Sequence, residues 1–197
     1  GILVFDLPDL PQQGGHHIRV FDNKSIDNDT DNFAPEGNIV GEVPRGTGII
    51  IMANSDVEIF NNVMSGNGTV NLSIVSYGDE TEDPNYYPHP KNIQVHGNTY
   101  GPSGFDPDLD TGDLAKALYD ISGGNMPDIF WDGIVPLSQI ILGQPDEEKL
   151  VIDEENASFL TIKPIKYMLG FSNPTNTNKN DFSGEIVPLR AISIETF

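Results

Sequence analysis

The sequence of 197 residues contains no cysteine. This absence excludes disulfide bonds, a thiolate nucleophile and zinc sites built on cysteine. Methionine is also scarce, with four residues. Since soft metal ions such as Cu(I) prefer sulfur ligands, the composition disfavours a metal-handling protein of that kind. The sequence has no run of 18 consecutive apolar residues, so it predicts no membrane insertion.

Positive charge is the second scarcity. Ten Lys and Arg residues oppose 30 Asp and Glu residues, which gives a formal net charge of -20. A surface this negative repels nucleic acid and anionic lipid, so we expect no nucleic-acid partner. It attracts divalent cations and basic partners, although solubility alone explains the charge equally simply.

Turn-forming residues are abundant. The chain has 20 Gly and 15 Pro, and 37% of its residues are hydrophobic, which is enough for one substantial core. This composition favours short strands joined by frequent turns over long helices.

Three stretches repeat one pattern: residues 18–23 (IRVFDN), 57–62 (VEIFNN) and 93–98 (IQVHGN). Each stretch has two β-branched residues two positions apart, followed three positions later by an asparagine. The three asparagines, Asn23, Asn62 and Asn98, are 39 and 36 positions apart. Repetition at this spacing predicts stacked units, with the asparagine amides bonded into an internal ladder at a shared corner. We expect the asparagine itself to adopt the left-handed backbone conformation there.

The repeat predicts two parts of the chain. Residues 1–100 carry regular strands, and the cleanest unit lies between Ile49 and Leu72. Residues 101–197 are expected to form the last units, loops and a C-terminal cap on the same stack. Within this second part, the pattern predicts a helix over residues 113–119. Further apolar runs, mostly predicted as strands, lie at residues 128–137, 149–152, 159–165, 185–187 and 191–194.

The stretches 48–51 (GIII) and 57–62, followed by Gly66 and Asn67, resemble the right-handed parallel β-helix repeat proteins of the pectate lyase-like superfamily. The whole chain is similar to the C-terminal part of secreted bacterial proteins of that group. The resemblance implies an all-β fold, namely a right-handed parallel β-helix (solenoid) with an irregular C-terminal cap. It also implies a secreted, periplasmic or cell-surface protein.

The first strand, residues 2–5 (ILVF), has no polar cap before it. Its upper edge would therefore be bare. We expect further units, or another β-helix chain or segment, to cover this N-terminal end.

Two acidic runs alternate carboxylates: Asp27, Asp29 and Asp31 in one, and Asp106, Asp108 and Asp110 in the other. Carboxylate oxygens in a tight loop can converge on Ca²⁺, which takes six to eight oxygen ligands. Each run is therefore a candidate calcium site, with a solvated acidic loop as the alternative.

Candidate contacts for a sugar are the aromatic residues Tyr86, Tyr87 and Trp131, because flat rings stack on pyranose faces. Packing of loops onto the stack is the alternative role. Among four histidines, His89 in the Tyr-rich loop is the candidate catalytic residue. His96 is expected to pack, and His16 and His17 are expected to point to opposite faces of a strand.

Two functions follow. The first is an extracellular β-helix protein that binds or modifies polysaccharide, with Ca²⁺ as a possible cofactor. If it is an enzyme, the resemblance implies a lyase-like or epimerase-like reaction, with catalytic units outside this chain. The alternative is a non-enzymatic structural or interaction module of a larger assembly.

Overall fold

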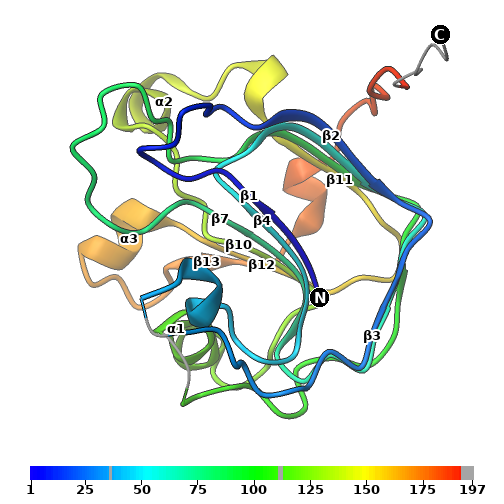
Figure 1. Ribbon diagram of the computed structural model, residues 1–197. Coiled ribbons are helices and arrows are strands. Elements are labelled where there is room, and N and C mark those ends of the chain that lie inside the picture. The colour runs from blue at the N-terminus through cyan, green and yellow to red at the C-terminus, as the bar shows by residue number, and fades with distance from the viewer. Residues whose placement is uncertain (36, 111–112, 192–197) are drawn as a thin grey trace, which may run out of the picture.

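The computed structural model describes residues 1–35, 37–110 and 113–191, and their strands form three sheets (Figure 1). Sheet A contains, in spatial order, β1 (Ile2–Phe5), β4 (Thr47–Met52), β7 (Val70–Val75), β10 (Ile129–Trp131), β12 (Phe159–Ile162) and β13 (Thr175–Asn176). Sheet B contains β11 (Leu150–Asp153), β8 (Lys91–His96), β5 (Ser55–Phe60) and β2 (His16–Phe21). Sheet C contains β3 (Lys24–Ile26), β6 (Val63–Ser65) and β9 (Thr99–Tyr100).

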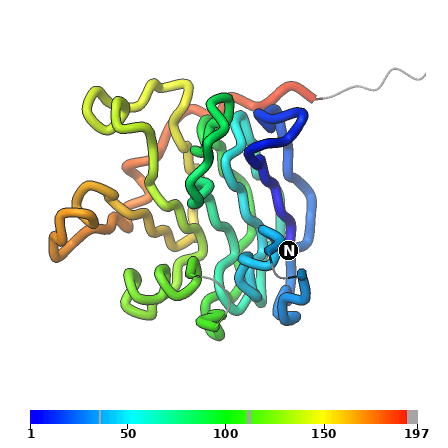
Figure 2. Tube along the Cα trace, turned by 60° about the vertical axis from the view of Figure 1, so that its left-hand side comes forward, coloured from blue at the N-terminus to red at the C-terminus, as the bar shows by residue number. Residues whose placement is uncertain are grey.

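From β1 to β9 the chain passes through sheets A, B and C in that order three times, and β10 to β13 add strands to sheets A and B only. We call each set of three consecutive strands, one from each sheet, a layer: β1, β2 and β3 form the first, and β4, β5 and β6 the second. Equivalent strands pair in parallel, so that Ile2 lies beside Ile49 and Ile49 beside Leu72. Figure 2 shows the layers following one another from the blue N-terminal layer to the yellow and orange C-terminal part.

The interior between the sheets is apolar. Ile49, Ile51, Val57 and Ile59 are 0% exposed and belong to one cluster with residues of all later layers. Sheet A is also covered on its outer face, where Ile50 and Phe130 pack in a second cluster. Burial on both faces explains why β4 is a continuous apolar run and not an alternating strand.

In the described residues, three α-helices interrupt this arrangement: α1 (Asp113–Ser122), α2 (Leu137–Leu142) and α3 (Pro164–Met168). Short 3₁₀ helices occur at η1 (Ile39–Glu42), η2 (Asp146–Glu148) and η3 (Lys179–Phe182). The helix predicted over residues 113–119 is confirmed by α1, which buries Ala115 and Leu118. None of the described helices has the length and apolar character needed to cross a bilayer.

The predicted fold class is wrong. The described chain is mixed α/β, with three α-helices and three sheets that are parallel except for the antiparallel pair β12–β13. No closed solenoid is found in it, so an all-β right-handed parallel β-helix (solenoid) with an irregular cap does not describe this protein. The physical reason lies after residue 100, where the segments between strands are long enough to form helices. The repeat in the first hundred residues carries no information about those segments.

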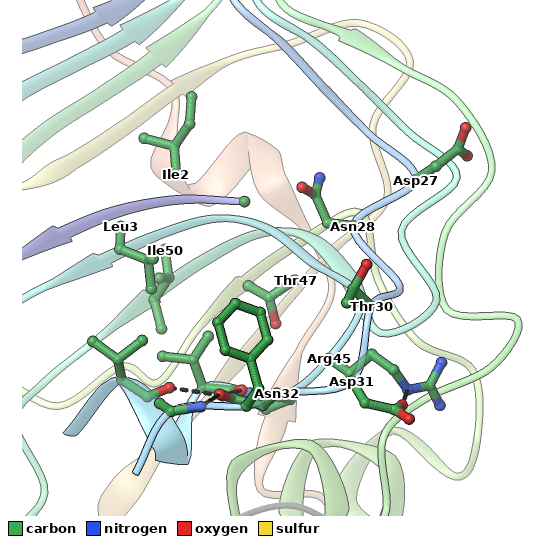
Figure 3. Close-up of a pocket in the computed structure, with 16 residues that line it drawn as sticks. Ile2, Leu3, Asp27, Asn28, Thr30, Asp31, Asn32, Arg45, Thr47 and Ile50 are labelled. Carbon is green, nitrogen blue, oxygen red and sulfur yellow. Dashed lines mark hydrogen bonds and ion pairs between the residues drawn. The ribbon is translucent and has the colours of Figure 1, made fainter. Parts of the chain in front are cut away.

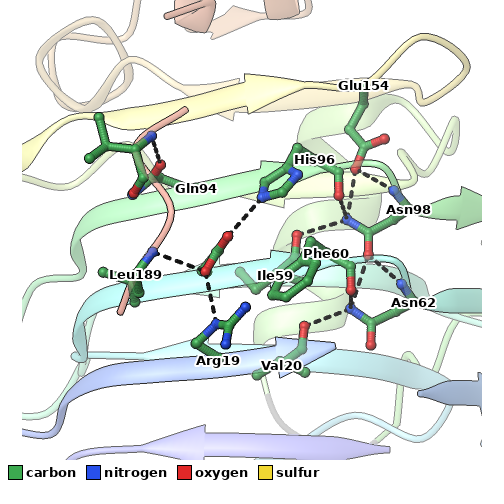
Figure 4. Close-up of polar contacts among 12 residues, drawn as sticks. Arg19, Val20, Ile59, Phe60, Asn62, Gln94, His96, Asn98, Glu154 and Leu189 are labelled. Atoms are coloured by element: carbon green, nitrogen blue, oxygen red, sulfur yellow. Dashed lines mark hydrogen bonds and ion pairs between the residues drawn. The ribbon is translucent and has the colours of Figure 1, made fainter. Parts of the chain in front are cut away.

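Of the strands predicted after residue 148, some are confirmed and others are not. β11 and β12 lie where strands were expected, but β12 ends at Ile162, and α3 begins at Pro164, a residue suited to a first helical turn. Residues 185–187 form no strand. Instead, Val187 donates from its N to Gln94 Oε1 at 2.7 Å and accepts from Gln94 Nε2 at 2.9 Å, which ties this segment onto sheet B (Figure 4). Of the predicted run at residues 191–194, residues 192–194 lie outside the described part of the chain.

Candidate functional site

The three strands of the first layer are all edge strands, one in each sheet. β1 is the outermost strand of sheet A, β2 of sheet B and β3 of sheet C. Each pairs along one edge only, with β4, β5 and β6 respectively, so the other edge presents unpaired backbone N–H and C=O groups. We call this surface, formed by residues 2–5, 16–21 and 24–26, the open face.

Inward-pointing side chains of the open face are incompletely covered. Ile2, Val4 and Ile18 are half-buried, whereas their register partners in the second layer, Ile49, Ile51 and Val57, are 0% exposed. Leu3, Phe21 and Ile26 on the same layer are 40–42% exposed. The first layer therefore resembles an internal layer from which one neighbour is absent.

The three predicted corner asparagines lie in one hydrogen-bonded row. Asn23 donates from its N and Nδ2 to Asn62 Oδ1, at 3.1 and 3.0 Å. Asn62 donates in the same way to Asn98 Oδ1, at 2.9 and 3.0 Å (Figure 4). Each amide also donates back to strand carbonyls, for example from Asn62 Nδ2 to Val20 O at 2.9 Å. Since Asn62 is only 1% exposed, this row is an internal structural element of the corner between sheets B and C.

The left-handed backbone at this corner belongs to the residue before each asparagine. Asp22, Asn61 and Gly97 have φ values of 55°, 55° and 64°. The prediction that the ladder asparagines themselves adopt this conformation is wrong. The preceding residue makes the turn, which leaves the asparagine side chain free to point inward along the stack.

A second row occupies the corner after sheet C. Asn28 donates from its N and Nδ2 to Asn67 Oδ1, at 3.3 and 2.9 Å. The preceding residues, Asp27 and Gly66, again have positive φ. Sequence reasoning did not predict this row, although Asn28 and Asn67 show the same 39-residue separation as Asn23 and Asn62.

Both rows run in one direction, from donor on the earlier layer to acceptor on the later one. The first row ends at Glu154 Oε1, which accepts from Asn98 N at 3.1 Å, Asn98 Nδ2 at 2.7 Å and Tyr100 Oη at 3.2 Å. Burial raises the pKa of Glu154, while these hydrogen bonds oppose the shift. An ionised carboxylate has no hydrogen to donate, so the row of donated hydrogen bonds cannot continue beyond Glu154. At the opposite end, no described residue donates to Asn23 Oδ1 or Asn28 Oδ1.

A stack of rings follows the same axis on the outside of sheet B. Phe21 and Phe60 have centroids 5.0 Å apart with planes at 9°, and Phe60 and His96 are 5.3 Å apart at 6°. His96 therefore packs, as predicted, and its Nε2 lies 3.1 Å from Glu58 Oε1. Glu58 is 1% exposed and also accepts from Arg19 Nε at 3.1 Å. The stack ends at the exposed ring of Phe21, on the open face.

A pocket of about 390 Å³ opens beside the first strand. β1 contributes Ile2 and Leu3 to its lining, and the segment after β3 contributes Asn28 and Thr30 (Figure 3). Thr47 also lines it, and its Oγ1 is buried with no hydrogen-bond partner among the described residues. The pocket extends the open face toward the second asparagine row.

The two acidic runs meet at one arginine. Arg45 Nε lies 3.5 Å from Asp31 Oδ1, and Arg45 Nη1 donates to Asp106 Oδ2 at 3.0 Å. Arg45 N donates to Asp108 Oδ2 at 2.8 Å. The hydrogen bond that Arg45 donates to Asp106, together with the nearby carboxylates, raises the pKa of Arg45.

The other members of these runs serve the backbone or lie apart. Asp29 Oδ1 accepts from Gly68 N at 2.8 Å, Asp27 turns the chain before Asn28, and Asp110 follows the run to the surface. Within the described residues, no group of three or more acidic or histidine side chains has the geometry of a metal site. The guanidinium of Arg45 thus takes the position of a cation between the runs, and calcium binding by Asp27, Asp29, Asp31, Asp106, Asp108 and Asp110 stays a prediction.

The predicted aromatic platform is not formed. Tyr86 and Trp131 are each 8% exposed and belong to different apolar clusters. Tyr86 Oη donates to Asp6 O at 2.7 Å, and the Trp131 ring packs edge-on against Phe182. Tyr87 is half-buried under Lys91, whose Nζ lies 4.9 Å from the ring centroid. Packing, the alternative role, describes Tyr86 and Trp131.

His89 lies beside a serine and near a buried carboxyl group. Its Nδ1 is 3.0 Å from Ser76 Oγ, and burial lowers its pKa. Ser76 N donates to Asp132 Oδ2 at 2.5 Å. The order of contacts is histidine, serine, carboxylate, so the carboxylate does not orient the imidazole as it would in a nucleophile–base–acid relay. These contacts give His89 no catalytic arrangement among the described residues.

The prediction for His16 and His17 is wrong. Their Nδ1 atoms are 3.0 Å apart, so the two rings meet instead of facing opposite sides of the strand. His17 has a φ of 58°, and it is skipped in the register between β2 and β5. Asp56 of β5 is likewise skipped and has a φ of 51°, so the two strands leave extended geometry together. The alternation on which the prediction rested holds only for extended residues.

No protein-family model, no curated protein and no solved structure matches this chain.

Proposed function

We propose that this protein is a non-enzymatic interaction module whose open face receives one further layer of parallel strands from another polypeptide segment. The observation that carries the proposal is the direction of the asparagine rows. Asn23 Oδ1 and Asn28 Oδ1 stand where every later ladder oxygen accepts two hydrogen bonds from the layer before it. The complementary segment therefore carries an asparagine at each of these two corners.

Apolar surface supports the same partner. Ile2, Val4 and Ile18 are half-buried, and the β-branched residues in the next layer at these positions are fully covered. Completing the burial of each such side chain contributes on the order of 1 kcal/mol. Unpaired strand edges add backbone hydrogen bonds along all three sheets.

A second copy of this chain is a poor partner on chemical grounds. If two open faces met, the acceptor Asn23 Oδ1 of one copy would face the acceptor Asn23 Oδ1 of the other, and neither would find a donor. The other end of the row is Glu154, which offers a carboxylate and no amide donor to the Asn23 of a neighbouring copy. The proposal therefore names a segment of different sequence with the same corner asparagines.

The polysaccharide hypothesis has less support. It rested on the family resemblance, the long corner loops and the Tyr-rich loop, with Tyr86, Tyr87 and Trp131 as candidate sugar contacts. Two of these rings, Tyr86 and Trp131, are buried in separate clusters. It remains a prediction made from the sequence.

A peptide copying residues 46–68, which include one complete layer with Asn62 and Asn67, provides the probe. Titrated as a labelled peptide against the full chain, it should give a saturable rise in fluorescence anisotropy. A matched peptide with Asn62→Leu and Asn67→Leu keeps the length and all strand residues of the first peptide but loses the side-chain amide donors. Because each lost hydrogen bond costs about 1 kcal/mol, this control should bind at least about tenfold more weakly.

The protein variant Asn23→Ala tests the same contact from the other side and should weaken binding of the first peptide. If the first peptide, with both asparagines, does not bind up to about 1 mM, the proposal is overturned. Equal binding of both peptides would show that apolar contact alone, without the amide rows, determines association.

A further inference from the structure

A second pocket, of about 290 Å³, lies on the outer face of sheet A, where it reaches Phe5 at the end of β1. Its floor is formed by strand residues, among them Met52, Val75 and Phe130, all buried. Leu114 and Leu118 of α1 close one side, and η1 contributes Ile39. The volume lies near the lower limit for small-molecule sites, and the walls are mainly apolar, as such sites usually are.

The charges around this pocket have one sign. Asp132, Asp79 and Glu42 line it, and none of the described lining residues is Lys, Arg or His. Asp132 is 8% exposed and forms no ion pair with a described residue. Its oxygens accept from neutral donors, namely Ser76 N at 2.5 Å and Ile134 N at 3.0 Å. A carboxylate has about four acceptor positions, so capacity for a further donor remains.

Burial raises the pKa of Asp132 to about 6. At pH 7 and above, the group is therefore mainly ionised, and it faces the cavity without a cationic partner. A buried charge of this kind is stabilised by a ligand of opposite charge.

Ser73 gives an independent indication of a missing ligand. It pairs in register with Ile50 on one side and Phe130 on the other, and both of these residues line the pocket. Ser73 is 1% exposed, and its Oγ has no hydrogen-bond partner among the described residues. An orphaned hydroxyl beneath an apolar pocket is unusual, because buried polar groups are normally paired.

We propose that this pocket binds a small amphiphilic amine, with its hydrocarbon part between sheet A and α1 and its ammonium group toward Asp132. The three carboxyl groups select for positive charge, and the apolar walls select for a short aliphatic or aromatic tail. Among the open-face residues, Phe5 alone lines this pocket. The proposal uses neither the unpaired strand edges nor the asparagine rows, so it does not depend on the proposed function.

Three probes of similar shape separate charge from apolar fit: 2-phenylethylamine, 2-phenylethanol and 3-phenylpropanoate. Calorimetric titration of the full chain at pH 7.5, a value chosen about 1.5 units above the Asp132 pKa, should show binding of the amine. The alcohol should bind at least about tenfold more weakly, and the carboxylate should not bind measurably. Equal affinity for amine and alcohol, or no binding of the amine up to about 1 mM, would overturn the proposal.

Two variants locate the binding. Asp132→Asn removes the charge and should reduce amine affinity at least about tenfold while leaving the alcohol unchanged. Ala117 lies at the exposed side of the lining, so Ala117→Phe should obstruct the pocket without disturbing the core. If Ala117→Phe binds the amine as the unmodified protein does, the ligand lies elsewhere and the proposal fails, even if Asp132→Asn does not fold.

Discussion

The two ends of the layered sheets differ in how their hydrogen bonds are completed. At the C-terminal end, Glu154 accepts the last amide of the first asparagine row, and β13 pairs antiparallel with β12. η3 packs there as well, with Lys179 Nζ donating to Glu155 O and Ala157 O at 2.8 and 2.9 Å. At the N-terminal end, no residue in the described part of the chain donates to Asn23 Oδ1 or pairs with the outer edges of β1, β2 and β3. A carboxylate and an antiparallel strand are thus local means of ending a parallel stack, and the open face has neither.

The largest expected effect is the difference in stability loss between mutating an internal and a terminal asparagine of the first row. Asn62→Ala removes donors to Val20 O, Phe60 O and Asn98 Oδ1 inside a fully buried corner. We expect a loss of about 3 to 5 kcal/mol in the free energy of unfolding, measured by urea denaturation. Asn23→Ala, at the open end, should cost only about 1 kcal/mol, because fewer groups lose a partner. Equal losses of unfolding free energy in Asn62→Ala and Asn23→Ala would mean that the open end of the row is no less complete than its interior.

The pH dependence of stability should arise from the later part of the chain. Burial raises the pKa of Asp132 to about 6, above the ordinary aspartate value of 3.8. Between these values the folded state keeps its proton while the unfolded state loses it, so stability falls as pH rises through this window. The penalty is then fully present above pH 6, at about 3 kcal/mol.

Asp132→Asn cannot titrate. Relative to the unmodified protein, this variant should therefore gain about 3 kcal/mol in unfolding free energy between pH 4 and pH 7, measured by denaturation at each pH. A constant difference between the two proteins over that range would contradict the assignment.

A smaller loss of stability is expected at the C-terminal end of the first row, where Glu154 accepts the last hydrogen bonds. Glu154→Ala leaves Asn98 N, Asn98 Nδ2 and Tyr100 Oη without their acceptor, and we expect a loss of about 2 kcal/mol in thermal or chemical denaturation. Glu154→Gln retains an acceptor oxygen and is the matched control, with an expected loss below about 1 kcal/mol. If both variants lose the same stability, the charge of Glu154, and not its acceptor geometry, closes the row.

The smallest expected effect is at the surface of the open end. Arg45→Met leaves Asp31, Asp106 and Asp108 facing one another without a cation. Because Asp31 and Asp106 are largely exposed, solvent screening limits the loss to about 1 kcal/mol. The loss should shrink in high salt, which screens repulsion between carboxylates. A salt-independent loss would point to packing of the arginine stem.

The sequence predicted the regular part of this fold well. Alternating β-branched residues at positions such as Val57 and Ile59 place strands correctly, and the spacing of Asn23, Asn62 and Asn98 predicts a row that the coordinates contain. These features are local and repeated, so they survive without knowledge of the tertiary structure. The same spacing would have predicted the row from Asn28 to Asn67, which was missed.

Features that depend on distant contacts could not be predicted. Trp131 and Tyr86 appear exposed in a loop-rich sequence, but Phe182 covers one, and the hydroxyl of the other bonds to Asp6. Arg45 joins two acidic runs that are about 75 residues apart in the sequence, so no local pattern relates them. The three helices lie outside the repeat and changed the fold class.

Amide hydrogen exchange of the full chain, with and without the peptide copying residues 46–68, tests the central claim most directly. The account predicts fast exchange at the unpaired edges of residues 2–5, 16–21 and 24–26 in the free protein, and protection of these segments when the peptide binds. Protection at β12, β13 or the Glu154 corner instead, or no change at the first layer under saturating peptide, would contradict it.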